Sequence, residues 1–171
     1  MDRLKKVIEQ YGRWAILSDF TERIEASMNT DFSICIENAK ALLESIGKEI
    51  CHCNKVILGK DPNFHEVLKN AFVALGYSKS SLVNQISGSM ANIAKQIGEL
   101  RNQIGATSHG RPLEELKERN NRVDELTRDF LIDSTVIIAC FLIRAFENEN
   151  PRGSSTEDIK DLYKDNNDST A

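Results

Sequence analysis

A single apolar stripe constrains the fold of this chain more than any other feature of its sequence. Between positions 82 and 104, large apolar side chains recur at steps of three or four residues, at Leu82, Ile86, Met90, Ile93, Ile97, Leu100 and Ile104. These steps match the 3.6-residue turn of an α-helix and do not fit the two-residue alternation of a half-buried strand. The stripe therefore predicts one long helix whose apolar face must pack against other elements.

Four further segments carry helical patterns together with the residues that start or stop helices. They are a segment over roughly 4–28, broken near Gly12; one from Asp31 to about Cys53; one from Asp61-Pro62 to Gly76; and one from Pro112 to about Asn148. No segment alternates like a strand. The sequence predicts an all-α fold, an antiparallel helical bundle. The side chains expected to be largely buried are Trp14, Leu42, Ile46, Ile93, Ile97, Phe130 and Ile137.

Composition divides the chain near residue 150. Residues 1–150 are predicted to form one helical-bundle domain, and Asn150-Pro151-Arg152-Gly153 stops its last helix. Residues 151–171 are predicted to form a disordered acidic tail. From Glu147 onward there are seven acids and three bases of the chain's 26 and 22, which leaves 19 of each sign before it. The body is therefore neutral, which is not typical of a general nucleic-acid binder but still permits a local basic cleft.

Metal, membrane and secretion signals are weak. Cys51-His52-Cys53 resembles a pair of zinc ligands, but no second ligand cluster follows at a suitable spacing, so no metal or cofactor is predicted. No apolar leader follows Met1, and we expect a cytoplasmic protein with free thiols. The apolar run Val136–Ile143 is far shorter than the roughly 20 residues that cross a bilayer. It is expected to belong to a buried helix, with no membrane partner.

A candidate site lies where the striped helix is expected to end. Arg101-Asn102 is followed, after a glycine-containing stretch, by His109-Gly110-Arg111. A guanidinium and a titratable imidazole on one loop are two groups that a phosphate-cleaving site without metal needs. From these residues alone, an ordinary loop between two helices is the more frequent explanation. Likewise, Lys40, Glu44 and Lys48 share one outer stripe and are expected to form i,i+4 charge pairs in solvent.

Two segments resemble the abortive-infection C-terminal family of the HEPN superfamily. Arg101-Asn102 and His109-Gly110 are similar to the superfamily motif of an Arg and a His separated by four to six residues, although seven separate them here. Ala39-Lys40-Ala41-Leu42-Leu43-Glu44 is similar to a pattern on the family's second helix. With the closing helix, the resemblance covers roughly residues 31–147 and leaves an extra N-terminal helical segment outside the HEPN-like core.

The resemblance implies a metal-independent endoribonuclease that acts as a toxin or abortive-infection (anti-phage) effector. It further implies RNA as substrate, a homodimer, and an antitoxin or regulatory protein as a further partner. By the same resemblance, His109 transfers protons, Arg101 stabilises developing charge, and Asn102 positions the loop or a phosphate. Three more cations are candidates for lining an RNA cleft, although solvated helix charges are their more frequent explanation: Arg111, Arg119 and Arg122.

The longer spacing between Arg101 and His109 keeps a second hypothesis open. In that hypothesis the chain is a catalytically inactive HEPN-fold module that binds RNA or a protein. A purely structural helical adaptor is a weaker explanation, because it gives no reason for the Arg-Asn and His-Gly elements.

Overall fold

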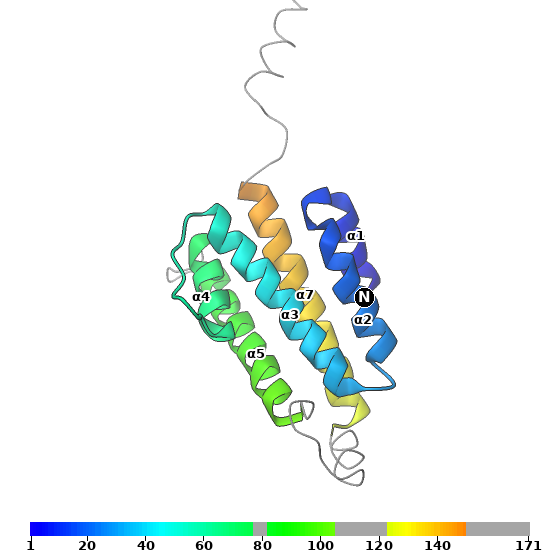
Figure 1. Ribbon diagram of the computed structural model, residues 1–171. Helices are drawn as coiled ribbons and strands as arrows, with labels where there is room; N and C mark the ends of the chain where they lie inside the picture. The colour runs from blue at the N-terminus through cyan, green and yellow to red at the C-terminus, as the bar shows by residue number, and fades with distance from the viewer. Residues whose placement is uncertain (77–81, 105–122, 150–171) are drawn as a thin grey trace, which may run out of the picture.

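The computed structural model describes residues 1–76, 82–104 and 123–149, and every regular element in these ranges is helical (Figure 1). The all-α prediction is therefore confirmed. The elements, in chain order, are α1 (Asp2–Gln10), the 3-10 helix η1 (Gly12–Leu17), α2 (Ser18–Ser27), α3 (Phe32–Cys53), α4 (Phe64–Ala74), α5 (Leu82–Ile104) and α7 (Glu125–Glu149). The predicted tail over 151–171 lies outside the described residues.

Several helix ends follow directly from local sequence. Asp31 caps α3, because its carboxylate accepts hydrogen bonds from the backbone N–H groups of Ser33, at 3.0 Å, and Ile34, at 3.3 Å. Gly76 follows the end of α4 with a φ of 82°, a left-handed conformation that costs little without a Cβ atom. The break near Gly12 is present as well, since α1 gives way there to η1.

Two predicted helix starts are wrong. α4 begins at Phe64 rather than at Pro62, because the Asn63 side chain accepts a hydrogen bond from the Glu66 N–H at 3.0 Å. The last helix is not continuous from Pro112, which itself lies outside the described residues. It begins at Glu125, after Asp124 accepts a hydrogen bond from the Thr127 N–H at 2.9 Å. In both places a side-chain cap decides the boundary.

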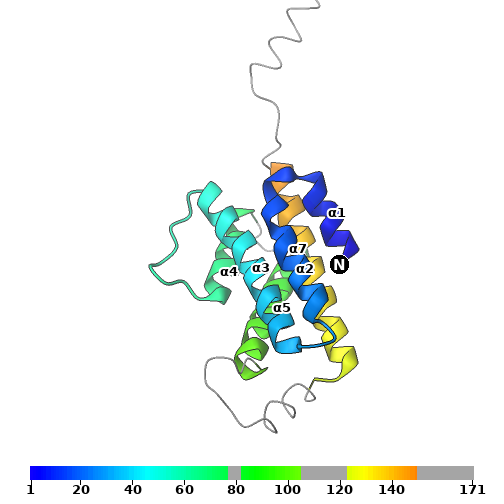
Figure 2. The ribbon, with the colours of Figure 1, turned by 45° about the vertical axis from the view of Figure 1, so that its right-hand side comes forward.

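α3 is the central helix of the bundle. It packs against α2, α4, α5 and α7, and Figure 2 shows it with α4 on one side and α2 and α7 on the other. Its ten buried residues are Phe32, Cys35, Ile36, Ala39, Leu42, Leu43, Ile46, Gly47, Ile50 and Cys51. Contact with four helices explains why its burial is wider than a single stripe. The other helices are therefore placed around α3.

Most of the predicted core is confirmed. Trp14, Leu42, Ile46 and Ile97 are at most 2% exposed, and Ile93 is partly buried against the core. On α5, the small residues Ala91, Ala94 and Gly98 are buried too. Because α5 contacts α3, α4 and α7, its buried surface extends beyond the predicted stripe.

Two predicted core residues on α7 are exposed instead. Phe130 is 58% exposed and Ile137 is 52% exposed. The buried face of α7 passes through Leu131, Ile138 and Leu142. Leu131 and Ile138 each follow a predicted core residue by one position, which is a rotation of about 100° around the helix. α7 contacts α1, α3 and α5, and these contacts select its buried face. Among the described residues, no helix has the length and apolar character to cross a membrane.

A cluster of side chains around Trp14 connects the N-terminal helices to the last helix. The Trp14 indole N–H donates a hydrogen bond of 2.8 Å to the Glu147 carboxylate, whose side chain is 2% exposed. The Trp14 ring also meets Phe146 edge to face, with 5.7 Å between centroids. The Arg13 guanidinium lies 5.1 Å from the centre of the Phe146 ring and donates to Glu49 on α3. This Trp14 cluster joins η1, α3 and α7.

Candidate functional site

Two of the predicted site residues lie at one end of α5. Arg101 and Asn102 lie in the last turn of α5, where the structure describes the backbone but not these side chains. His109 and the cations predicted to line an RNA cleft, which are Arg111, Arg119 and Arg122, lie outside the described residues. The geometry of the Arg101–His109 pair therefore stays a prediction.

The scaffold around this end of α5 is described. α5 ends and α7 begins at the same end of the bundle, next to the start of α3 (Figure 1). Arg128 on α7 is held there, because its Nε–H donates to the Val123 carbonyl at 3.0 Å and its guanidinium lies 5.4 Å from the centre of the Phe32 ring. Nothing in the local sequence pattern marks Arg128 as a positioned cation, so it was not predicted as a site residue.

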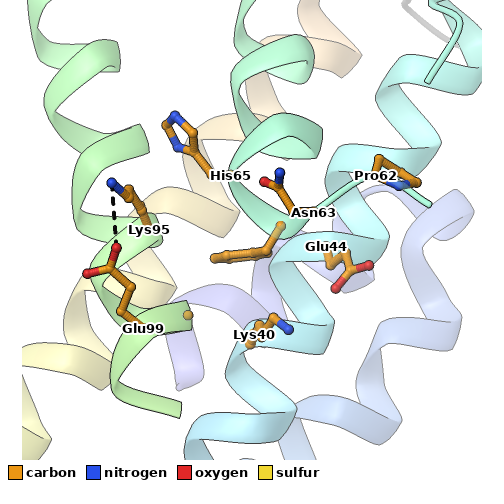
Figure 3. Close-up of a pocket in the computed structure, with 9 residues that line it drawn as sticks. Lys40, Glu44, Pro62, Asn63, His65, Lys95 and Glu99 are labelled. Atoms are coloured by element: carbon orange, nitrogen blue, oxygen red, sulfur yellow. Dashed lines mark ion pairs between the residues drawn. The ribbon is translucent and has the colours of Figure 1, made fainter. Parts of the chain in front are cut away.

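A pocket of about 320 Å³ opens between α3, α4 and α5 (Figure 3). α3 contributes Lys40 and Glu44 to its lining. The two residues before α4 and the first two of α4 contribute Pro62, Asn63, Phe64 and His65. α5 contributes Lys95, Gly98 and Glu99. The i,i+4 pattern predicts that Lys40 and Glu44 lie on a solvated outer stripe, but the start of α4 comes close enough to form a pocket beside them.

The floor of this three-helix pocket depends on a glycine. A Cβ atom at Gly98 would lie 2.8 Å from Cδ1 of Phe64, which is too close for two carbon atoms. The absence of a side chain there lets the start of α4 approach α5. Lys40 Nζ lies 5.8 Å from the centre of the Phe64 ring, within the range of a cation–π contact. The aromatic ring is therefore placed between α5 and the Lys40 ammonium.

The charges of the three-helix pocket are mixed. Lys95 forms an ion pair of 3.5 Å with Glu99 within α5, as the dashed line in Figure 3 marks. Glu44 pairs with Lys48 at 2.6 Å, as the i,i+4 spacing predicts. Lys40, by contrast, forms no ion pair with a described residue. The pocket thus presents both ammonium and carboxylate groups to a ligand.

One buried polar atom beside the pocket lacks a partner. His65 Nδ1 is buried and has no hydrogen bond to any described residue. Figure 3 shows the His65 imidazole near Lys95, between α4 and α5. A buried polar atom without a partner is costly, and a bound molecule or water removes that cost. The arrangement suits a polar ligand with both donors and acceptors.

The described residues contain no group of three or more His, Cys, Asp or Glu side chains that is arranged to hold a metal ion. In Cys51-His52-Cys53, the Cys51 thiol is buried, whereas His52 and Cys53 are exposed. Burial raises the pKa of the Cys51 thiol. It also raises the pKa of Cys35 to about 12, which favours the protonated, unreactive thiol.

Comparison with protein families shows to which family the chain belongs. The family model Abi_C, described as a HEPN-like domain, matches residues 14–146. The chain belongs to the Abi_C family. Comparisons with curated proteins and with solved structures give no match.

The Abi_C match begins at Trp14 rather than near residue 31, where the resemblance was expected to begin. The Trp14 cluster gives a physical reason, because Trp14 and Phe146, at the two ends of the match, touch each other. The family-like stretch on α3 also divides by role. Its apolar residues Ala39, Leu42 and Leu43 are core, while Lys40 and Glu44 line the three-helix pocket.

Proposed function

We propose that this Abi_C domain is a metal-independent endoribonuclease that acts as a toxin or abortive-infection effector in the cytoplasm. The observation that carries the proposal is the HEPN-like family match over residues 14–146, because active members of the superfamily cleave RNA. The placement of Arg101 and Asn102 supports it, since both lie at the end of α5 that meets the start of α7. An antitoxin or regulatory protein that restrains the activity is part of the proposal.

The proposed reaction uses the RNA's own 2′-hydroxyl as nucleophile. His109 accepts the proton of this hydroxyl, and the oxygen attacks the adjacent phosphorus. The bond from phosphorus to the 5′-oxygen breaks, and that oxygen takes a proton from an imidazole or from water. Arg101 donates hydrogen bonds to the phosphate oxygens as negative charge builds on them. Asn102 positions the loop or a phosphate, and Arg111, Arg119 and Arg122 line the RNA cleft.

Purified protein should cleave RNA in the presence of EDTA and leave DNA of the same sequence intact. The expected fragments end in a 2′,3′-cyclic phosphate, or its hydrolysis product, and in a 5′-hydroxyl group, because the nucleophile belongs to the ribose. Mass spectrometry of the fragments checks this. Cleavage that requires added magnesium, or that also acts on DNA, contradicts the proposal.

A homodimer is the proposed assembly, because one loop supplies a single imidazole for two proton transfers. α7 presents three exposed apolar side chains, Leu126, Phe130 and Ile137. An apolar face of this kind on a folded domain is typical of a protein–protein contact. The first residues of α7 also lie at the end of the bundle where α5 ends.

Phe130→Glu should convert the dimer to a monomer, since it places a charge in the proposed interface. Light scattering at micromolar concentration measures the change. Ile57→Glu is the matched control, because Ile57 is 95% exposed in the segment between α3 and α4. A wild-type chain that is monomeric while it cleaves RNA argues against this assembly.

The alternative function is a HEPN-fold module that binds RNA or a protein without cleaving it. The observation that favours it is the seven-residue separation of Arg101 and His109, one more than the usual motif allows. A stable RNA complex that yields no fragments is the result expected from this alternative.

A further inference from the structure

We propose that the three-helix pocket holds one nucleotide of the bound RNA, with a base that carries an exocyclic amino group. Such bases are cytosine, adenine and guanine, but not uracil. The inference rests on the proposed RNA substrate and adds a binding site for a nucleotide that is a few positions away from the cleaved bond. It is carried by the lining of the pocket and by its position along α5.

The pocket lies along the same helix that ends in Arg101 and Asn102. Lys95 and Glu99 lie on the same helix as Arg101 and Asn102, and Lys95 precedes Asn102 by seven residues. At ~1.5 Å per residue, this separation is about 10 Å along the helix axis. Stacked nucleotides of one strand advance by about 3.4 Å each, so the separation is that of about three nucleotides. An RNA strand that has one phosphate at the end of α5 can therefore place a nearby nucleotide in the pocket.

The lining of the pocket carries charges of both signs. Free phosphate or another purely anionic ligand suits this pocket poorly, because Glu44 and Glu99 stand beside Lys40 and Lys95. A nucleotide matches both signs. Its phosphate accepts hydrogen bonds from lysine ammonium groups, and an amino group on its base donates to a carboxylate, as cytosine N4 does to Asp or Glu. Uracil has no such amino group.

A buried imidazole nitrogen beside the pocket lacks a partner, because His65 Nδ1 has no hydrogen bond to a described residue. A base edge or a ribose hydroxyl in the pocket can pair with this nitrogen once the imidazole turns toward it. The pocket volume of about 320 Å³ lies within the range of small-ligand sites. The Phe64 ring, held between Gly98 and Lys40, provides an apolar floor for the flat base.

The test compares the binding of two short homopolymers, oligo(C) and oligo(U), to the full chain. Both are made with 2′-O-methyl ribose, which removes the nucleophile and prevents cleavage. Fluorescence anisotropy should show about tenfold tighter binding of oligo(C), the order expected for one base contact. Glu99→Gln should reduce this preference several-fold, because an amide oxygen accepts the amino group less strongly than a carboxylate does. Lys40→Ala should weaken both complexes several-fold.

Lys69→Ala and Glu9→Gln are the matched controls, since both residues are exposed and lie outside the pocket. They should bind both oligomers as the wild type does. A loss of base preference is a readout that a merely structural defect does not produce, and circular dichroism checks that each variant is folded.

Equal affinity for the two oligomers, or wild-type binding by the Glu99 and Lys40 variants, overturns the inference. If ordinary RNA is still cleaved in that case, the proposed nuclease function stands and only the nucleotide pocket fails. If the wild-type chain neither binds nor cleaves RNA, the proposed function fails and the pocket proposal fails with it.

Discussion

Replacing His109 with alanine is expected to lower the rate of RNA cleavage about a hundredfold or more, the usual effect of losing an acid–base group. An imidazole ordinarily titrates at about pH 6.5, so at neutral pH it can both accept and donate a proton. Alanine has no group that does so. The rate is measured with purified protein and a labelled RNA under single-turnover conditions, and in cells by growth arrest and RNA fragments.

Arg101→Ala should cause a loss of similar size, because it removes the group proposed to stabilise charge on the phosphate. Arg101→Lys should restore only part of the rate, since an ammonium group lacks the planar pair of donors. Asn102→Ala should be milder. Arg144→Ala is the control, because Arg144 is exposed and lies near the C-terminal end of α7, far along the helix from its start. Cleavage that survives both the His109 and the Arg101 substitutions refutes the proposed site.

Trp14→Ala is expected to lower the free energy of unfolding by about 3–5 kcal/mol, the range for removing a large buried aromatic side chain. Trp14 is 2% exposed and packs edge to face on Phe146. Its removal also leaves the buried Glu147 carboxylate without its 2.8 Å hydrogen bond. Chemical denaturation followed by circular dichroism measures the loss, because the variant has no tryptophan left for fluorescence.

A second substitution separates packing from hydrogen bonding in the Trp14 cluster. Trp14→Phe keeps an aromatic ring but removes the indole N–H. It should cost about 1–3 kcal/mol through the lost hydrogen bond to the buried Glu147 carboxylate, plus a smaller loss of packing. Ile16→Ala, at a side chain that is 73% exposed, should change stability little. A Trp14→Ala variant as stable as the Ile16 control shows that the Trp14 cluster does not stabilise the bundle.

Local sequence determined the helices and several of their ends. The three- and four-residue steps of α5, the Asp31 cap and the Gly76 turn depend on groups within a few residues of one another. Such interactions join groups that are close in the sequence, so they can be predicted without a fold. The family-like stretch of α3 was likewise found from sequence, and the Abi_C match confirms the family. The roles of Arg101 and His109 remain predictions.

Contacts between distant residues decided the rest. α7 buries the face through Leu131 and Ile138 instead of the one through Phe130, because α1, α3 and α5 meet it on that side. The hydrogen bond between Trp14 and Glu147 joins residues 133 positions apart. The three-helix pocket combines α3, α4 and α5, and it exists because Gly98 lets the Phe64 ring approach α5. Periodicity shows that a residue lies on a helix face, but only packing determines what covers that face.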